Sequence, residues 1–106
     1  RDFTDVRDVV RAYDLLLKYG KSGEVYNICT GRETKMEALL NKMISSSGLK
    51  INVEKDETLF RSAEQQRICG SNEKLRNETG WLPEILLEQT LADMVDEWKN
   101  RLTTNN

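Results

Sequence analysis

The sequence predicts an α/β chain, α+β when taken by itself, with about four helices and two or three short strands. Four segments carry apolar residues at the three- and four-residue spacing of an amphipathic helix, and two others are rich in β-prone residues. Hydrophobic residues make up 38% and charged residues 32%, which is typical of a folded domain rather than a disordered chain or a membrane span. Two strands cannot cover four amphipathic faces, so we expect some apolar stripes to pack on something outside residues 1–106.

The first helix is expected between Val6 and Leu17, where the apolar residues form a single stripe. Thr4 or Asp5 can cap its start, and Gly20 can end it. The β-prone run 24–29 follows without a clean alternation of apolar and polar residues. We therefore expect a strand there that is buried on both faces.

The second helix is indicated by Thr34 and Glu37, which have the spacing of a capping box and precede an apolar stripe over 36–44. A half-exposed strand is expected at Ile51 and Val53, which alternate with polar neighbours. No period holds over 56–70. A short helix over about 72–79, closed by Gly80, and a last helix over about 87–102 complete the predicted elements.

Three aromatic residues, Tyr13, Tyr26 and Trp98, fall on these patterned elements. We expect them in the core rather than stacked on a nucleotide base. Cys29 and Cys69 are likewise expected to be small buried hydrophobes rather than redox groups.

The composition excludes several classes of site. There is no histidine and no C-x-x-C pair, which argues against a zinc site and against Ser–His or Cys–His nucleophiles. Sixteen basic and eighteen acidic residues give a net charge of −2, so no general positive field attracts nucleic acid or an anionic membrane. With no signal peptide or apolar 18-mer, a cytoplasmic protein with free thiols is expected. The first residue is not methionine, which we interpret as a sign of a longer parent protein.

No G-x-G-x-x-G or G-K-[ST] loop is present, so no dinucleotide fold begins in this chain. Two places, residues 1–10 and residues 60–64 followed by 70–75, combine arginine with nearby carboxylates in stretches without a clear pattern. A guanidinium fork suits phosphate oxygens, and a carboxylate accepts hydrogen bonds from sugar hydroxyls. The alternative is that these are surface charges that serve only solvation and weak ion pairs.

Four strings carry a more specific signal, namely R-D-F-T-D-V-R-D at 1–8, G-E-V-Y-N-I at 23–28, R-S-A-E at 61–64, and K-L at 74–75 with G-W-L-P at 80–83. Together and in this order they resemble the extended short-chain dehydrogenase/reductase nucleotide-sugar enzymes of the NAD-dependent epimerase/dehydratase family. The wording is most similar to the GDP-sugar branch, which includes the GDP-4-keto-6-deoxymannose reductases and the GDP-mannose 4,6-dehydratases. The first string favours the reductases, because the dehydratases usually read R-D-W-G-x-A-x-D-Y there.

The resemblance implies a parent enzyme with an N-terminal NAD(P)-binding Rossmann domain and a Tyr-x-x-x-Lys pair, neither of which lies in residues 1–106. The chain would be its C-terminal nucleotide-sugar-binding segment, inactive by itself, with a GDP-sugar and the missing domain as partners. Arg1 and Arg61 match arginines that contact the substrate diphosphate, and Glu64 matches the acid that binds the ribose hydroxyls. Ser62 replaces the family's proline, which leaves the loop less preorganised. Exposed apolar stripes would also allow self-association.

A second class of function is kept beside this one. A small helical module whose exposed apolar stripes bind a partner chain would show the same helices without any role in nucleotide-sugar binding. Binding of a GDP-sugar, set against binding of proteins, distinguishes the two.

Overall fold

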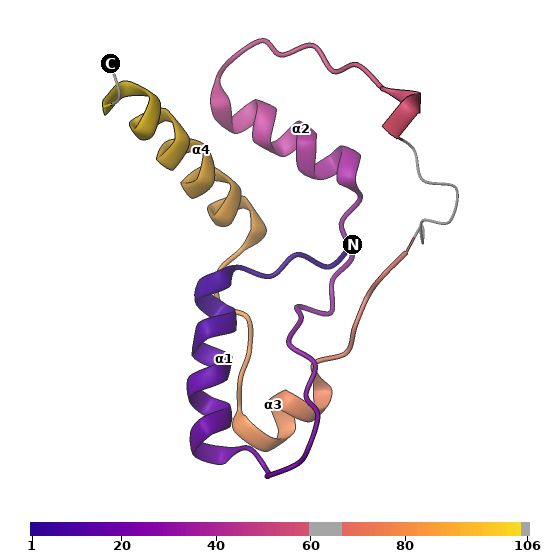
Figure 1. The fold of residues 1–106 in the computed structure, drawn as a ribbon, viewed down its shortest axis with the longest axis vertical. Helices are drawn as coiled ribbons and strands as arrows, with labels where there is room; N and C mark the ends of the chain where they lie inside the picture. The colour runs from indigo at the N-terminus through magenta and orange to yellow at the C-terminus, as the bar shows by residue number, and fades with distance from the viewer. Residues whose placement is uncertain (60–66, 105–106) are drawn as a thin grey trace.

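The computed structural model describes residues 1–59 and 67–104 (Figure 1). These hold α1 (Val6–Tyr19), α2 (Met36–Ser47), the 3₁₀ turn η1 (Glu57–Leu59), α3 (Glu73–Thr79) and α4 (Leu87–Thr104). α1 contacts α3 in one half of the molecule, and α2 contacts α4 in the other. The Cα radius of gyration is 17.2 Å, against about 13 Å for a compact domain of 100 residues. The chain is therefore open and spread out.

Neither expected strand forms, and residues 1–59 and 67–104 contain no strand at all. A strand needs a neighbour whose main chain completes a hydrogen-bonded ladder, and no other described segment supplies one. Along 24–29, side chains bind part of the main chain instead. Lys74 Nζ donates to the Val25 oxygen at 2.9 Å, and Asn72 Nδ2 donates to the Cys29 oxygen at 2.9 Å. The strands of the predicted α/β or α+β chain were therefore wrong for the described residues, whereas the four expected helices are confirmed.

The second expected strand, at Ile51 and Val53, lies on the surface. Both side chains are about half exposed, and no described segment pairs with their main chain.

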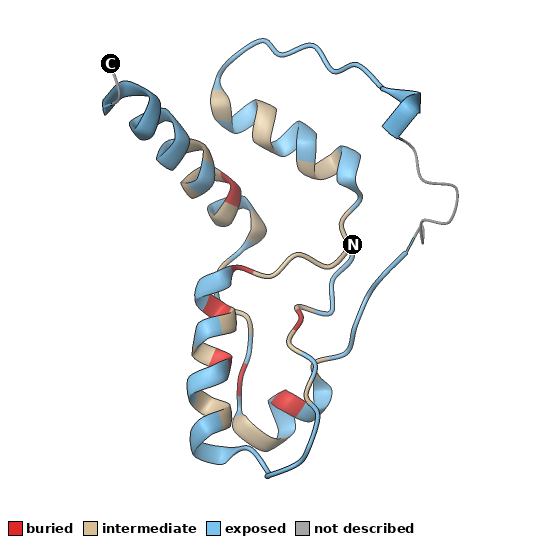
Figure 2. Ribbon diagram, in the orientation of Figure 1, coloured by how far each residue is buried: buried red, intermediate tan, exposed pale blue. Residues whose placement is uncertain are grey.

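The core is small and lies between α1 and α3 (Figure 2). Ala12, Leu75 and Trp81 are fully buried. The indole Nε1 of Trp81 donates to the main-chain oxygen of Asp8 at 2.9 Å, so the one polar atom of this side chain is satisfied. Partly buried apolar residues surround the three, namely Leu15, Leu16, Tyr26 and Ile28.

The ends of α1 agree with the sequence signals. The Asp5 carboxylate accepts from the Arg7 main-chain N–H at 2.8 Å and caps the start, and the Gly20 N–H donates to the Leu16 oxygen at 2.8 Å at the end. Gly80 closes α3 with a φ of 76°, a left-handed conformation that glycine adopts without strain.

The start of α2 differs from the prediction. The capping box of Thr34 and Glu37 does not form: Lys35 is the N-cap, and no side chain caps the helix. Thr34 is drawn out of the capping position because its main chain pairs with Arg1. The Thr34 N–H donates to the Arg1 oxygen at 2.8 Å, and the Arg1 nitrogen donates to the Thr34 oxygen at 3.1 Å.

Large apolar side chains remain on the surface of α1 and α4. On α1 they form one stripe that consists of Val6, Val10, Tyr13 and Leu17, and Leu17 is 89% exposed. We expected a stripe through Val9, Val10, Tyr13 and Leu17 to be left uncovered; this is confirmed for Val10, Tyr13 and Leu17, whereas Val9 is partly buried. Tyr26 packs on the core as predicted, whereas Tyr13 and Trp98 are more than half exposed. Within the described ranges no helix is long and apolar enough to cross a membrane.

Candidate functional site

Asp2 fixes the N-terminal segment to the loop 30–34. Its carboxylate accepts three hydrogen bonds: from the Thr30 N–H at 3.0 Å, from the Thr30 hydroxyl at 2.6 Å and from the Gly31 N–H at 2.8 Å. With the main-chain pair between Arg1 and Thr34, this clamp holds Arg1 beside the loop.

Asp5 ties α1 to α4. Its buried carboxylate receives two hydrogen bonds from the Arg7 guanidinium, at 2.8 and 2.9 Å, and one from the Thr90 hydroxyl at 2.6 Å. Arg7 also donates to Asp93 at 2.9 Å. These bonds, with that of Arg7 first, hold the pKa of Asp5 well below its usual range, and the two carboxylates raise the pKa of Arg7.

Asp8 fixes the segment between α3 and α4. It is only 2% exposed, and its carboxylate accepts from the main-chain N–H groups of Glu84 and Ile85 and from the Arg11 guanidinium, at 3.1 to 3.2 Å. The three aspartates at every third position thus each hold a different segment. The sequence suggested these carboxylates as acceptors for sugar hydroxyls, but here they serve the fold.

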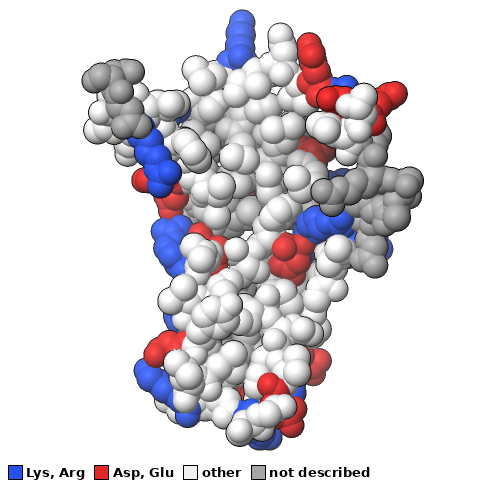
Figure 3. Space-filling view, viewed as in Figure 1, with Lys and Arg blue, Asp and Glu red and all other residues white. Residues whose placement is uncertain are grey.

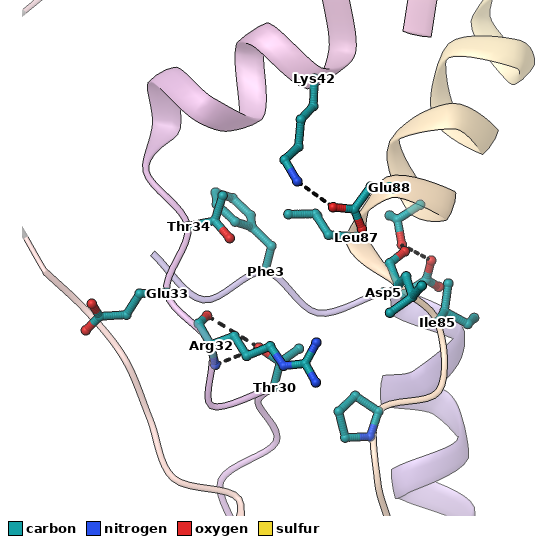
Figure 4. Close-up of a pocket in the computed structure, with 13 residues that line it drawn as sticks. Phe3, Asp5, Thr30, Arg32, Glu33, Thr34, Lys42, Ile85, Leu87 and Glu88 are labelled. Atoms are coloured by element: carbon teal, nitrogen blue, oxygen red, sulfur yellow. Dashed lines mark hydrogen bonds and ion pairs between the residues drawn. The ribbon is translucent and has the colours of Figure 1, made fainter. Parts of the chain in front are cut away.

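A cavity of about 230 Å³ lies where residues 3–5, the loop 30–34, α2 and the start of α4 meet (Figure 4). Arg32 extends into this space from the loop, and Phe3 lies on the side nearer α2. Lys42 of α2 donates to Glu88 of α4 across it. That bond, the backbone of Glu88 and the positive charges of Lys42 and Arg32 lower the pKa of Glu88. The cavity wall is thus charged, with basic groups on two elements.

The predicted site residues can be placed only in part. The main chain of Arg1 pairs with Thr34, which lines this cavity, although Arg1 itself is not among the lining residues. Arg61 and Glu64 lie outside the described residues. Arg67, the first residue described after them, forms a two-pronged ion pair with Glu33 at 2.7 to 3.1 Å. This pair attaches the chain that follows the R-S-A-E string to the loop 30–34.

Arg32 and Lys42 were missed in the sequence. Arg32 lies in the loop between the expected strand 24–29 and the next predicted helix. An arginine in such a loop could have been considered as a phosphate-binding residue. Lys42 lay in a helical pattern and gave no signal of its own. Cys29 is buried as expected, whereas Cys69 is exposed, because it lies in a segment without a covering element. Across residues 1–59 and 67–104, no three potential metal-ligating His, Cys, Asp or Glu side chains are grouped.

Residues 1–94 match the family model described as GDP-mannose 4,6 dehydratase. The chain belongs to this family. As a GDP-mannose 4,6 dehydratase family member, it is 39% identical over 102 residues to GDP-6-deoxy-D-mannose reductase of Pseudomonas aeruginosa, covering 96% of this chain and 34% of the relative. It is 32% identical to GDP-mannose 4,6 dehydratase 2 of Arabidopsis thaliana over 99 residues, 92% of this chain and 26% of that relative.

Solved structures agree with this GDP-mannose 4,6 dehydratase family assignment. The structure of RMD from Pseudomonas aeruginosa with NADPH superimposes with a TM-score of 0.89 at 40% identity, over 95% of this chain and 33% of that one. The dTDP-glucose 4,6-dehydratase from Bacillus anthracis with NAD gives 0.77 at 28% identity, over 94% and 31%. The chain therefore spans about a third of the length of the relatives it matches, and the family resemblance seen in its sequence strings is confirmed.

Proposed function

We propose that residues 1–106 are the C-terminal nucleotide-sugar-binding part of an NAD(P)-dependent enzyme that acts on GDP-deoxyhexoses. The observation that carries this proposal is the 39% identity to GDP-6-deoxy-D-mannose reductase over 96% of the chain. That relative favours a reductase acting on GDP-4-keto-6-deoxymannose. A GDP-mannose 4,6-dehydratase is the second candidate, because the family model and the plant relative carry that description.

The chain's own contribution is to bind and orient the substrate. Arg1 and Arg61 bind the diphosphate, since a guanidinium offers paired donors to phosphate oxygens. Glu64 accepts hydrogen bonds from the ribose hydroxyls. The bonds that Asp2 receives from Thr30 and Gly31 support this role for Arg1, because they fix the backbone beside it before substrate arrives.

The rest of the full-length enzyme would supply the NAD(P)-binding domain and the Tyr-x-x-x-Lys pair, neither of which is present in this sequence. NAD(P)H would provide the hydride that reduces the C4 ketone of the sugar. By itself the chain is therefore inactive. The cofactors named for solved relatives, NADPH and NAD, support this cofactor class.

The exposed stripe of α1, Val6, Val10, Tyr13 and Leu17, packs against that cofactor-binding domain in the full-length enzyme. An uncovered apolar face of this kind usually marks an interface. The length of the relatives, about three times that of this chain, supports a partner within the same polypeptide. We place the enzyme in the cytoplasm, in keeping with the free thiols of Cys29 and Cys69.

The test supplies the full-length protein with two substrates in separate assays. GDP-4-keto-6-deoxymannose with NADPH, followed by loss of absorbance at the nicotinamide band, detects the reductase; GDP-mannose with NADP⁺, followed by the appearance of the 4-keto product, detects the dehydratase. We expect turnover in the first assay and none by residues 1–106 alone. Binding of neither GDP-sugar by the full-length protein would overturn the proposal, and turnover by the chain alone would overturn its assignment as a binding part.

A further inference from the structure

A second hollow adjoins the cavity of Figure 4, and Thr30, Arg32 and Pro83 line both spaces. Apart from the loop 30–32, its wall comes from the residues before α3, from Arg76 within that helix and from the turn that follows it. No Asp or Glu lines this hollow, although acidic residues outnumber basic ones in the whole chain. The lining residues are Thr30, Gly31, Arg32, Gly70, Ser71, Asn72, Arg76, Leu82 and Pro83.

The two arginines of this hollow differ from other described arginines. Four arginines elsewhere each form an ion pair with a carboxylate, namely Arg7, Arg11, Arg67 and Arg101. Within residues 1–59 and 67–104, the guanidinium groups of Arg32 and Arg76 form no hydrogen bond or ion pair with a carboxylate. A single exposed arginine is ordinarily only solvated. Two arginines from separate elements that line the same hollow, without an acidic residue in its wall, have the composition of an anion site.

Hydrogen bonds hold the two walls together. Asn72 Nδ2 donates to the Cys29 oxygen at 2.9 Å and joins the residues before α3 to the loop that carries Arg32. Asp2 fixes Thr30 and Gly31 from the other side. The spacing of the walls is thus set before any ligand binds, which reduces the entropy lost on binding.

A third donor faces the same space. The Ser71 hydroxyl oxygen accepts from the Glu73 N–H at 3.3 Å, which leaves the hydroxyl proton available to donate. We propose that this hollow binds a phosphoryl oxyanion through Arg32, Arg76 and the Ser71 hydroxyl. Its residues are not those proposed above for the diphosphate, Arg1 and Arg61. Its ligand is either inorganic phosphate or a phosphoryl group of a bound nucleotide.

The test measures the binding of inorganic phosphate to the full-length protein by calorimetry at low ionic strength. Arg32→Gln and Arg76→Gln should each weaken phosphate binding about tenfold, because each removes a charge-assisted pair of donors. Arg101→Gln is the matched control, since it removes the same charge from α4, where Arg101 pairs with Glu97. Other phosphate sites contribute equally to all variants. Equal phosphate affinity in wild type, both hollow variants and control overturns the proposal.

Two further measurements control for misfolding and identify the source of the phosphoryl group. Arg32→Lys and Arg76→Lys keep the charge and should lose less affinity than the glutamine variants; thermal unfolding checks that each variant is folded. If GDP-mannose displaces inorganic phosphate, the hollow takes a phosphoryl group of the nucleotide, and if both bind together it takes a separate phosphate. If the full-length protein binds phosphate in this hollow but binds no GDP-sugar, the proposed function is wrong and the phosphate site is still supported.

Discussion

Trp81 and Asp8 are joined by a hydrogen bond across 73 residues of sequence: the indole Nε1 donates to the Asp8 main-chain oxygen at 2.9 Å. The same Asp8 accepts through its carboxylate from the N–H groups of Glu84 and Ile85. The G-W-L-P turn is therefore held to α1 both by its aromatic ring and by the backbone that follows it. This contact lies at the centre of the only fully buried cluster among the described residues.

Trp81→Phe tests this contact. The change keeps an aromatic ring but removes part of the volume and the indole donor, so the Asp8 oxygen loses its hydrogen bond from Trp81 inside the core. We expect the free energy of unfolding to fall by about 1–3 kcal/mol, measured by urea denaturation. Trp98→Phe is the control, because Trp98 is 58% exposed and its replacement should change stability little. An equal effect of the two changes would contradict the role assigned to Trp81.

Asp5 gives the chain an acid-sensitive joint between α1 and α4. The hydrogen bonds from Arg7, above all, lower the pKa of Asp5 in the folded state. A lowered pKa means that the carboxylate stabilises the fold fully above its unfolded value of about 4, and that this stability is lost as the pH falls towards the folded value. We expect the wild-type unfolding temperature to drop between about pH 4 and pH 2 through this group.

Asp5→Asn should remove that part of the pH dependence. Asparagine still caps a helix, but it cannot form the ion pair with Arg7, so the variant should be less stable at pH 7 and should lose less on acidification. Thermal unfolding monitored by circular dichroism over this range measures the difference. Asp14→Asn is the control on the exposed side of α1, where Asp14 pairs with Lys18. A wild-type and Asp5→Asn difference that stays constant with pH would refute the linkage.

The helices were predictable from the sequence because their signals are local. The residues that begin or end a helix act within one turn of it, as Asp5, Gly20 and Gly80 do. The apolar spacing identifies the helical residues between these ends. The strands were not predictable in this way, because a strand depends on a partner segment and the described chain offers none to 24–29. The prediction of Thr34 as a cap was wrong for a similar reason, because its main chain pairs with Arg1, which is distant in sequence.

The candidate site was predictable to a smaller degree. The sequence shows that Asp2 and Asp8 are acidic, but not which groups face them, and their partners come from distant segments. It also offers no reason to connect Arg32 with Arg76, which line one hollow only because α3 lies beside the loop. The net charge of the sequence does not show where charges gather on the surface. Figure 3 shows that on this face charged residues of both signs lie mainly towards the edges, and that uncharged residues cover much of the middle.

The exposed stripe of α1 should matter only in the full-length enzyme. Leu17 is 89% exposed in this chain, so Leu17→Glu should leave the stability of residues 1–106 nearly unchanged. If the cofactor-binding domain covers the stripe, the same change in the full-length protein buries a charge and should cost about 2–4 kcal/mol. Urea denaturation of both proteins measures this. Lys18→Glu, at the neighbouring exposed position, is the control, and equal small effects in both proteins would rule out the docking.

The last prediction concerns Arg61 and Glu64, which we propose act together on the nucleotide end of the substrate. In the full-length enzyme, Arg61→Ala removes charge-assisted hydrogen bonds to the diphosphate that are worth about 1.5–3 kcal/mol. The affinity for the GDP-sugar should therefore fall roughly ten- to a hundredfold. Cofactor binding should barely change, because we propose that NAD(P) binds to the part of the enzyme outside residues 1–106. Calorimetric titration with GDP-mannose and, separately, with NADPH measures both.

Glu64→Gln keeps the shape of the side chain but loses its charge, so a smaller loss is expected, and only for ligands that retain the ribose. Comparing GDP-mannose with mannose 1-phosphate as ligands therefore separates the two residues: Arg61→Ala should weaken both, and Glu64→Gln only the first. Arg67→Ala is the matched control for Arg61, because Arg67 pairs with Glu33 within the fold and should affect stability before it affects binding. If Arg61→Ala lowered the unfolding temperature while GDP-mannose affinity stayed unchanged, Arg61 would be a structural ion-pair partner rather than a ligand of the diphosphate.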